Sequence, residues 1–232
     1  ENSPRVVSDS PSIKEERIYF DMQRIRGSIN LFGATLDDVE LKDHNDSINE
    51  NSESIKVLTR ESSERPYLIR MGWASIGNEN FPDKNTLWKA NKKQYKNNEV
   101  IELTWNNKDN IKFIRKIEID ENFIFKVSDS VENNSDKDVE LTNFAYIQRR
   151  NYRPQNKFFI LHEGPLGVFN ETLKEVSYDE LEEIGSISES TTNGWIGITD
   201  HYWQVAIFPE TNKKFKARFK DIKKEKDSIQ VD

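Results

Sequence analysis

Short runs in which apolar and polar residues alternate are the feature that most limits how this chain can fold. A clean example is Ile101, Leu103 and Trp105, each followed by a polar residue. Because successive side chains of a strand point to opposite faces, this period of two predicts a strand with one buried face. Similar runs occupy residues 117–119, 123–127 and 213–220, and clusters of turn-forming residues lie at 106–110, 120–122 and 133–136. The sequence therefore predicts a mainly β fold, with antiparallel strands in two packed sheets and few short helices.

Other parts of the chain give weaker signals. Residues 1–16 contain two prolines and four serines without an apolar period, which predicts a flexible linker, and residues 17–232 are predicted to form a single domain. Two short strands are expected around a bend at Gly33-Ala34. Residues 43–63 are polar and predict a long loop or an excursion between strands. Residues 177–183 predict either a short helix capped by Ser177 or a turn.

Charge and composition exclude several classes of function. Lys and Arg total 34 against 41 Asp and Glu, so the formal net charge is −7, with both signs mixed along the chain. Nucleic-acid binding needs a basic face that neutralises phosphates, so no nucleic-acid partner is expected. The absence of cysteine rules out disulfides and thiolate metal sites. Apolar runs are only a few residues long, far below the roughly 20 that a membrane-spanning helix needs, and no signal peptide is expected.

No arrangement of residues in the sequence predicts catalysis. His44, His162 and His201 each stand beside an acidic residue, but neighbours on a strand point to opposite faces. None has the helical spacing of a zinc site, so ordinary polar roles are expected, with no metal and no cofactor. Pro165 and Gly167 are expected to shape a turn after an apolar strand at residues 158–161.

Two strings in the last third of the chain are rich in glycine and aromatic residues. Residues 158–168 read FFILHEGPLGV, and residues 194–203 read GWIGITDHYW. Together with strings at residues 27–31, 66–67, 72–73 and 103–107, in the same order, they closely resemble the periplasmic domain of the bacterial membrane protein insertase YidC. The motif residues, expected to be structural, are Gly164, Pro165, Gly167, Gly194, Trp195, Gly197, Thr199, Asp200, Tyr202 and Trp203.

This resemblance implies a twisted β-super-sandwich similar to the fold of sugar mutarotases. It also implies a place in the periplasm, as part of an inner-membrane protein to which residues 1–16 would be the tether. The implied partners are the Sec translocon and SecDF, and nascent inner-membrane proteins through the full-length protein. In the family, insertion is attributed to a transmembrane region that this sequence does not contain. A non-catalytic docking or scaffolding role, without insertase activity of its own, is therefore expected.

A partner surface is predicted in the acidic, weakly periodic segment between residues 163 and 193. Its candidate residues are Glu171, Lys174, Asp179, Glu182 and Glu183. The basic residues that alternate from Lys213 to Lys220 predict a strand whose outer face either meets anionic lipid headgroups or forms a charged sheet edge.

Two other functions stay open from the sequence. A carbohydrate-binding or mutarotase-like enzyme domain would need a histidine and a carboxylate in one cleft. A periplasmic chaperone-like peptide binder would need an exposed apolar groove.

Overall fold

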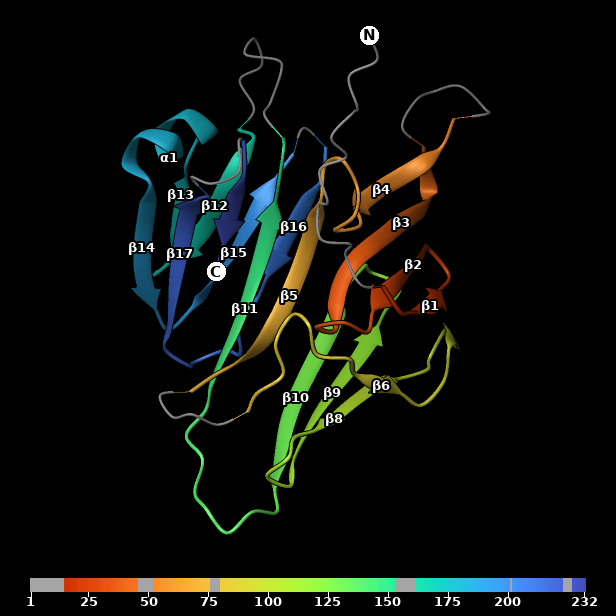
Figure 1. Cartoon of the computed structure of the whole chain (residues 1–232). Coiled ribbons are helices and arrows are strands. Elements are labelled where there is room, and N and C mark those ends of the chain that lie inside the picture. The colour runs from red at the N-terminus through yellow and green to blue at the C-terminus, as the bar shows by residue number, and fades with distance from the viewer. Residues whose placement is uncertain (1–14, 46–51, 76–79, 153–161, 201, 223–226) are drawn as a thin grey trace, which may run out of the picture.

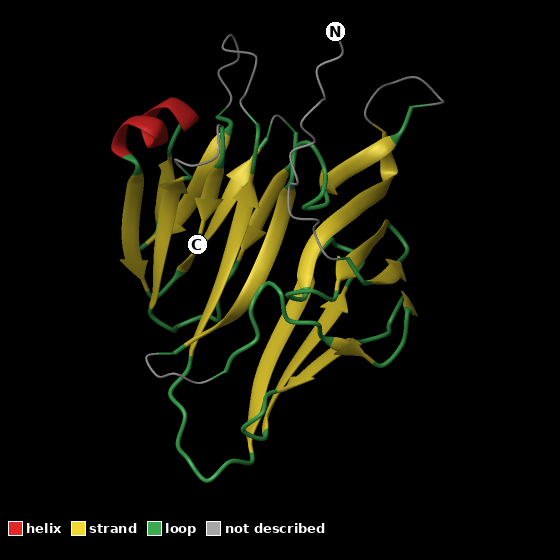
Figure 2. Ribbon diagram, viewed as in Figure 1, coloured by secondary structure: helices red, strands yellow, loops and turns green. Residues whose placement is uncertain are grey.

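The computed structural model describes residues 15–45, 52–75, 80–152, 162–200, 202–222 and 227–232. One short helix and many strands occupy these residues (Figures 1 and 2). In chain order the elements are β1 (Arg17–Asp21), β2 (Ile25–Asn30), β3 (Thr35–Asn45), β4 (Ser54–Leu58), β5 (Tyr67–Ala74), β6 (Lys89–Ala90), β7 (Gln94–Lys96), β8 (Ile101–Asn106), β9 (Ile111–Ile119), β10 (Phe125–Asn133), β11 (Thr142–Arg149), β12 (Gly164–Phe169), β13 (Thr172–Glu175), α1 (Tyr178–Ile184), β14 (Ser186–Thr191), β15 (Gly194–Thr199), β16 (Gln204–Ile207), β17 (Phe215–Asp221) and β18 (Ile229–Val231).

The largest sheet has ten strands in the order β14-β17-β18-β11-β5-β3-β2-β1-β7, with β4 paired to β3 beside this path. Figure 1 shows it running from β14 on the left to β1 on the right. Its neighbouring strands are antiparallel, except that β1 and β7 run parallel. Because β18 lies between β17 and β11, strands far apart in sequence meet in the middle of this sheet.

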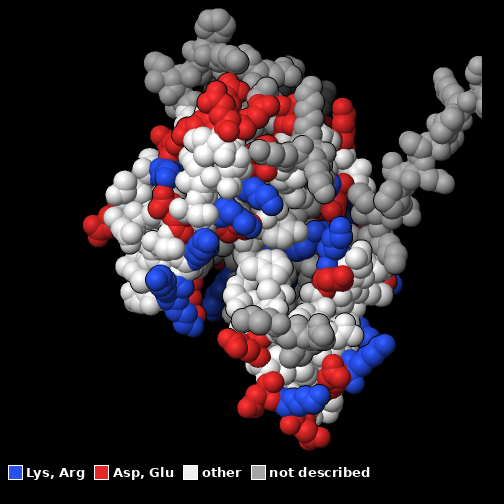
Figure 3. Space-filling view, turned by 60° about the vertical axis from the view of Figure 1, so that its left-hand side comes forward, with Lys and Arg blue, Asp and Glu red and all other residues white. Residues whose placement is uncertain are grey.

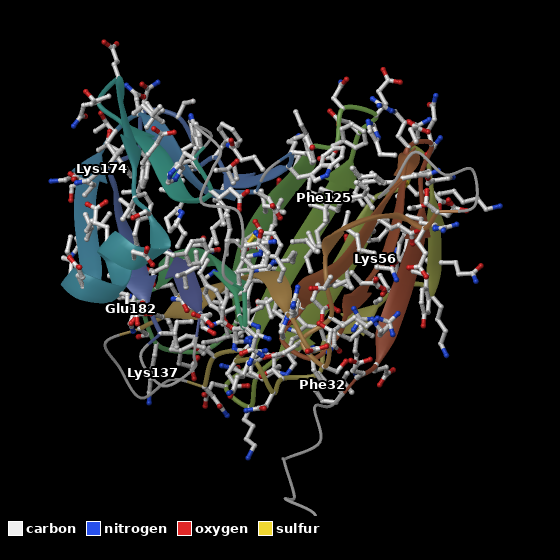
Figure 4. The ribbon with its side chains drawn as sticks, turned by 90° about the horizontal axis from the view of Figure 1, so that it is seen from above. Phe32, Lys56, Phe125, Lys137, Lys174 and Glu182 are labelled. Carbon is white, nitrogen blue, oxygen red and sulfur yellow. The ribbon has the colours of Figure 1, made fainter. Side chains whose placement is uncertain are left out.

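Two four-stranded sheets cover one face of the large sheet. Their orders are β10-β9-β8-β6 and β13-β12-β15-β16. On β5, Trp73 packs edge-on against Phe113 of β9, and the hydroxyl of Tyr67 donates to the carbonyl of Ile198 on β15. Because Tyr67 and Trp73 are six residues apart on one strand, they point to the same face. Seen from above in Figure 4, the two small sheets form two lobes, one near Lys174 and one near Phe125.

Several expectations from the sequence are confirmed. The fold is mainly β with antiparallel sheets, and the alternating run at residues 101–105 forms β8. The candidate helix is α1, in which the Ser177 hydroxyl accepts a hydrogen bond from the Glu180 backbone N–H at 3.1 Å. The bend at Gly33-Ala34 separates β2 from β3, and both residues have positive φ angles, 68° and 47°.

Three other expectations are wrong. Residues 43–63 are not a continuous loop, because β3 extends to Asn45 and β4 occupies Ser54–Leu58, where it pairs with β3 and Leu58 is buried in the core. Pro165 and Gly167 do not form a turn but lie inside β12, where Pro165 stands near the first residue and removes at most one ladder hydrogen bond. The basic strand β17 is not a sheet edge, since it pairs with β14 on one side and β18 on the other.

Three further segments, for which a loop, a strand and a linker were predicted, compare with the structure as follows. The segment from residue 163 to 193 is not a loop, because it contains β12, β13, α1 and β14. The apolar strand predicted at residues 158–161 lies outside the described residues. Glu15 and Glu16, at the end of the predicted linker, are attached to the fold: the Glu16 carbonyl accepts from Leu31 N–H at 2.6 Å, and the Glu15 carboxylate accepts from the Ser62 hydroxyl at 2.7 Å.

A fully buried arginine lies between the large sheet and one small sheet. The guanidinium of Arg115 on β9 makes two hydrogen bonds of 2.8 Å to the Asp129 carboxylate on β10, and a third of 3.1 Å to the Met71 carbonyl. Its carbon Cζ also lies 5.3 Å from the ring centre of Trp73 and 5.6 Å from that of Trp88. A buried charge needs such partners, because loss of hydration is otherwise uncompensated.

Candidate functional site

The two glycine-rich strings lie side by side in one small sheet. Strand β12 pairs with β15 from Gly164↔Thr199 to Phe169↔Gly194. At Gly194, φ is +147°, and a Cβ atom would lie 1.8 Å from the carbonyl oxygen of Val168. No L side chain fits this approach of two backbones. Glycine at this position therefore allows β12 and β15 to approach closely, which is a structural role.

Asp200, at the end of the second string, ties this small sheet to the large one. Its carboxylate accepts a hydrogen bond of 2.6 Å from Nη2 of Arg149, the last residue of β11. The Arg149 guanidinium carbon lies 3.4 Å from the ring centre of Tyr152 and 4.7 Å from that of Tyr67. This combination of an ion pair and cation–π stacking fixes a nearly buried arginine where the two sheets meet.

Three tyrosines surround Arg149, and burial raises the pKa of each. Tyr67 and Tyr178 are buried, and the pKa of both lies above the ordinary value because the charged phenolate would lose its hydration. Burial also raises the pKa of Tyr152 to about 12, and the positive charge of Arg149 opposes this shift only in part. All three phenols are therefore neutral at physiological pH; the hydroxyls of Tyr67 and Tyr152 form hydrogen bonds, and Tyr178 packs its ring against that of Tyr152.

These pKa shifts predict a loss of stability in alkaline solution. In the unfolded chain a tyrosine ionises near pH 10, whereas Tyr67 and Tyr178 stay neutral in the fold. Above about pH 10 the unfolded state therefore binds fewer protons than the folded state. The free energy of unfolding keeps its full value below this pH and falls above it, by about 1.4 kcal/mol per pH unit for each such tyrosine. Denaturant titrations across this range, with tyrosinate absorbance, measure the slope. Tyr178→Phe should lower the slope by about 1.4 kcal/mol per pH unit, whereas Tyr202→Phe, at a side chain that is 78% exposed, is the control that should leave it unchanged. Equal slopes for wild type and Tyr178→Phe would contradict the assignment.

The remaining motif residues lie around the ends of β15 and β16. The Thr199 hydroxyl donates to the Asp200 carbonyl at 3.1 Å, and Gly197 faces Ala206 in the β15–β16 ladder. Trp203 packs edge-on against His44 of β3 at 5.0 Å between ring centres. Tyr202 is 78% exposed. Trp195 lies on the outer side of the sheet and contacts Phe208 instead of entering the core.

The described histidines form no recognisable catalytic arrangement. Nε2 of His162 lies 3.0 Å from the Pro165 carbonyl, and His44 packs on Trp203. His201 lies outside the described residues. Among the residues that the structure describes, no group of three or more His, Asp or Glu side chains is placed to hold a metal ion.

The five predicted partner-surface residues do not form one patch. Asp179, Glu182 and Glu183 are exposed together on α1, where Figure 3 shows acidic side chains gathered at the top of the molecule. Lys174 instead makes an ion pair of 2.5 Å with Glu189, which joins β13 to β14. Glu171 stands in the turn between β12 and β13, at the other end of β13 from α1. Only the α1 group remains together as a surface.

A groove of about 770 Å³ lies between β4 with residues 59–63 and the strands β1, β2, β3 and β7. Seven of its sixteen lining residues are charged, and four of them form two ion pairs: Arg26 bonds Glu40 at 2.5 Å, and Arg60 bonds Asp38 at 2.9 Å. The hydrogen bond from Arg26 lowers the pKa of the Glu40 carboxyl. None of the described residues that line this groove is a histidine.

Sequence reasoning missed Arg149 and its tyrosines. A signal was present, since Arg149 continues the inward-facing positions of Ala145 and Ile147 in one alternating strand. A charged residue at a core-facing position requires a carboxylate partner elsewhere in the chain. The sequence could not identify that partner as Asp200, because the two are 51 residues apart.

Comparison with known proteins places this chain among the periplasmic domains of membrane protein insertases. The chain is 34% identical over 228 residues to the membrane protein insertase YidC of Granulibacter bethesdensis, covering 94% of this chain and 39% of that protein. It is 30% identical over 235 residues to the YidC insertase of Rickettsia bellii, covering 100% and 42% of the two chains, and 30% identical over 220 residues to that of Rickettsia prowazekii, covering 94% and 39%.

A family model described as the YidC periplasmic domain matches residues 17–232. The chain belongs to this family. It spans about 40% of the length of the curated relatives it matches. Within the described residues, no helix has the length and apolar character needed to cross a membrane.

Proposed function

We propose that this chain is a non-catalytic periplasmic domain that docks other components of the machinery for membrane protein insertion. Residues 17–232 would form a single domain and residues 1–16 its tether. The partners would be the Sec translocon and SecDF, and nascent inner-membrane proteins would be reached through the full-length protein. Family membership supports the setting, and the acidic surface of α1 is the observation that supports docking.

The α1 surface is suited to a basic partner. Tyr178 and Leu181 are buried and anchor the helix to the sandwich, while Asp179, Glu182 and Glu183 are exposed on it. The N–H of Asp221, the last residue of β17, also donates to the Gly185 carbonyl just after the helix, at 2.9 Å. Negative charges on a rigid support attract a positively charged surface and raise the association rate.

Removal of these charges should weaken docking without unfolding the domain. For the variant Asp179→Asn/Glu182→Gln/Glu183→Gln, the dissociation constant for purified SecDF–translocon complex is expected to rise on the order of ten-fold at low salt, mainly through slower association. Biolayer interferometry across a salt series would measure it.

A matched control changes the net charge equally on the other lobe. Glu102→Gln, Glu118→Gln and Glu132→Gln combined remove three exposed or half-buried carboxylates from β8, β9 and β10. If the control variant loses as much affinity as the α1 variant, the effect is one of overall charge and the α1 docking surface is rejected.

The alternatives have less support from the geometry. The charged groove beside β4 contains no histidine among its described residues, so it lacks the acid–base pair that a mutarotase-like reaction needs. An apolar peptide bound there would have to cover two ion pairs, Arg26–Glu40 and Arg60–Asp38, which disfavours a chaperone-like peptide binder.

A further inference from the structure

A row of apolar side chains crosses the small sheet that carries the motif. Val168 on β12 lies opposite Leu173 on β13 and opposite Trp195 on β15. The ring centres of Trp195 and Phe208 are 5.8 Å apart, and Phe208 directly follows Ile207, the partner of Ile196. The row Leu173–Val168–Trp195–Phe208 therefore spans the four strands, about 14 Å at the usual strand spacing.

This row faces away from the large sheet. The neighbouring residues in sequence point inward: Ile196 is buried, and Phe169 packs against Phe219 of β17. Side chains alternate along a strand, so Val168 and Trp195 point outward. At the two ends of the row, Leu173 is 53% exposed and Phe208 is 71% exposed. An outward apolar row of this kind is atypical of solvated sheet faces, whose outward positions are usually polar.

Lysines follow the apolar row directly. After Phe208 the chain turns through residues 209–214 into β17, and Lys213, Lys214 and Lys216 are all exposed there. Lys213 pairs with Glu210 at 2.5 Å. Figure 3 shows basic side chains at the lower end of this lobe, well separated from the acidic group on top. The exposed Phe208 and these lysines thus lie at the end of the lobe opposite α1, with Lys216 at the start of β17 on the outer face of the large sheet.

We propose that this end of the lobe rests on the surface of an anionic lipid bilayer. Trp and Phe side chains favour the boundary between headgroups and acyl chains, and lysines beside them are attracted to anionic headgroups. The row stands on an open sheet face instead of in a groove, so it fits a broad surface better than an extended peptide. Relatives that contain this domain are membrane insertases, which places a bilayer close to it. The α1 surface takes no part in this contact.

Vesicle co-sedimentation tests the proposal with the soluble chain. The chain should bind vesicles of phosphatidylglycerol and phosphatidylethanolamine, and much less to phosphatidylcholine alone. Leu173→Ser/Phe208→Ser should reduce the partition coefficient at least ten-fold. Lys214→Gln/Lys216→Gln should reduce it about five-fold for each lysine at low salt, and less at high salt. Because the four residues are exposed, far-UV circular dichroism should be unchanged.

Control variants carry the same chemical changes on the other lobe. Val100→Ser/Ile124→Ser removes two exposed apolar side chains, and Lys112→Gln/Lys126→Gln removes two exposed or half-buried lysines. These should retain wild-type binding. The proposal is overturned if wild type binds neither kind of vesicle, if the controls lose as much as the test variants, or if sedimentation shows a dimer that Phe208→Ser dissociates while vesicle binding is absent.

Discussion

Replacing Asp129 by alanine is expected to lower the free energy of unfolding by about 3–5 kcal/mol. The substitution leaves the Arg115 guanidinium fully buried and removes the carboxylate with which it forms an ion pair. Arg115 has no easy route to water, because it also bonds the Met71 carbonyl and lies against Trp73. Urea titration followed by tryptophan fluorescence measures the loss.

A double variant separates the burial of an unpaired charge from simple loss of packing. In Arg115→Met/Asp129→Leu both charges are replaced by apolar groups of similar length, which is often neutral for a buried ion pair. Stability should therefore recover most of what Asp129→Ala loses. A double variant as unstable as the single one would show that the pair contributes through its own attraction, against this expectation. Glu132→Ala, on the exposed side of β10, should change stability by less than about 1 kcal/mol.

The second large effect is expected at Gly194. Gly194→Ala would place a methyl group 1.8 Å from the Val168 carbonyl oxygen, at a φ angle of +147° that alanine disfavours. The neighbour is backbone, so β12 and β15 must separate for the methyl to fit. A loss of about 3 kcal/mol or more is expected, accompanied by faster hydrogen exchange at the amides of β12 and β15.

Gly72 provides the matched control for this glycine. A Cβ atom there would meet the ring of Phe144 at 2.9 Å, but that ring is partly exposed and can move aside. Gly72→Ala should therefore cost less than about 1 kcal/mol. If both alanine variants are equally stable, the close approach of the two strands at Gly194 tolerates a side chain and the structural reading of this motif glycine fails.

Local patterns were sufficient for many strands and for the helix. The alternation at Ile101, Leu103 and Trp105 predicted β8 because burial of one face is decided by residues next to one another. Ser177 predicted the start of α1 because a cap is satisfied within one turn. Strand β4 was missed although Ile55 and Val57 pack against the core and Leu58 is buried, because this short apolar run is surrounded by polar residues.

Contacts between distant residues set the limit of prediction for the site. Arg149 meets Asp200 only because the large sheet, which contains β11, packs against the small sheet, in which Asp200 follows β15. Lys174 was predicted to meet a partner protein, but it pairs with Glu189 once β13 lies beside β14. Whether a surface charge is available for binding thus depends on sheet order, which alternation does not encode.

The position of β18 gives this fold a particular order of assembly. Strand β11 pairs with β18 across 82 residues of sequence, as at Gln148 and Gln230, and β17 reaches β11 only through β18. Until residues 229–231 are in place, β11 and β17 each keep an unpaired edge, and the large sheet consists of two halves. Such long-range closure slows folding and exposes edges to wrong partners. The large sheet is thus complete only once residues 229–231 are available, which favours folding of the finished sequence over folding from its N-terminal part onward.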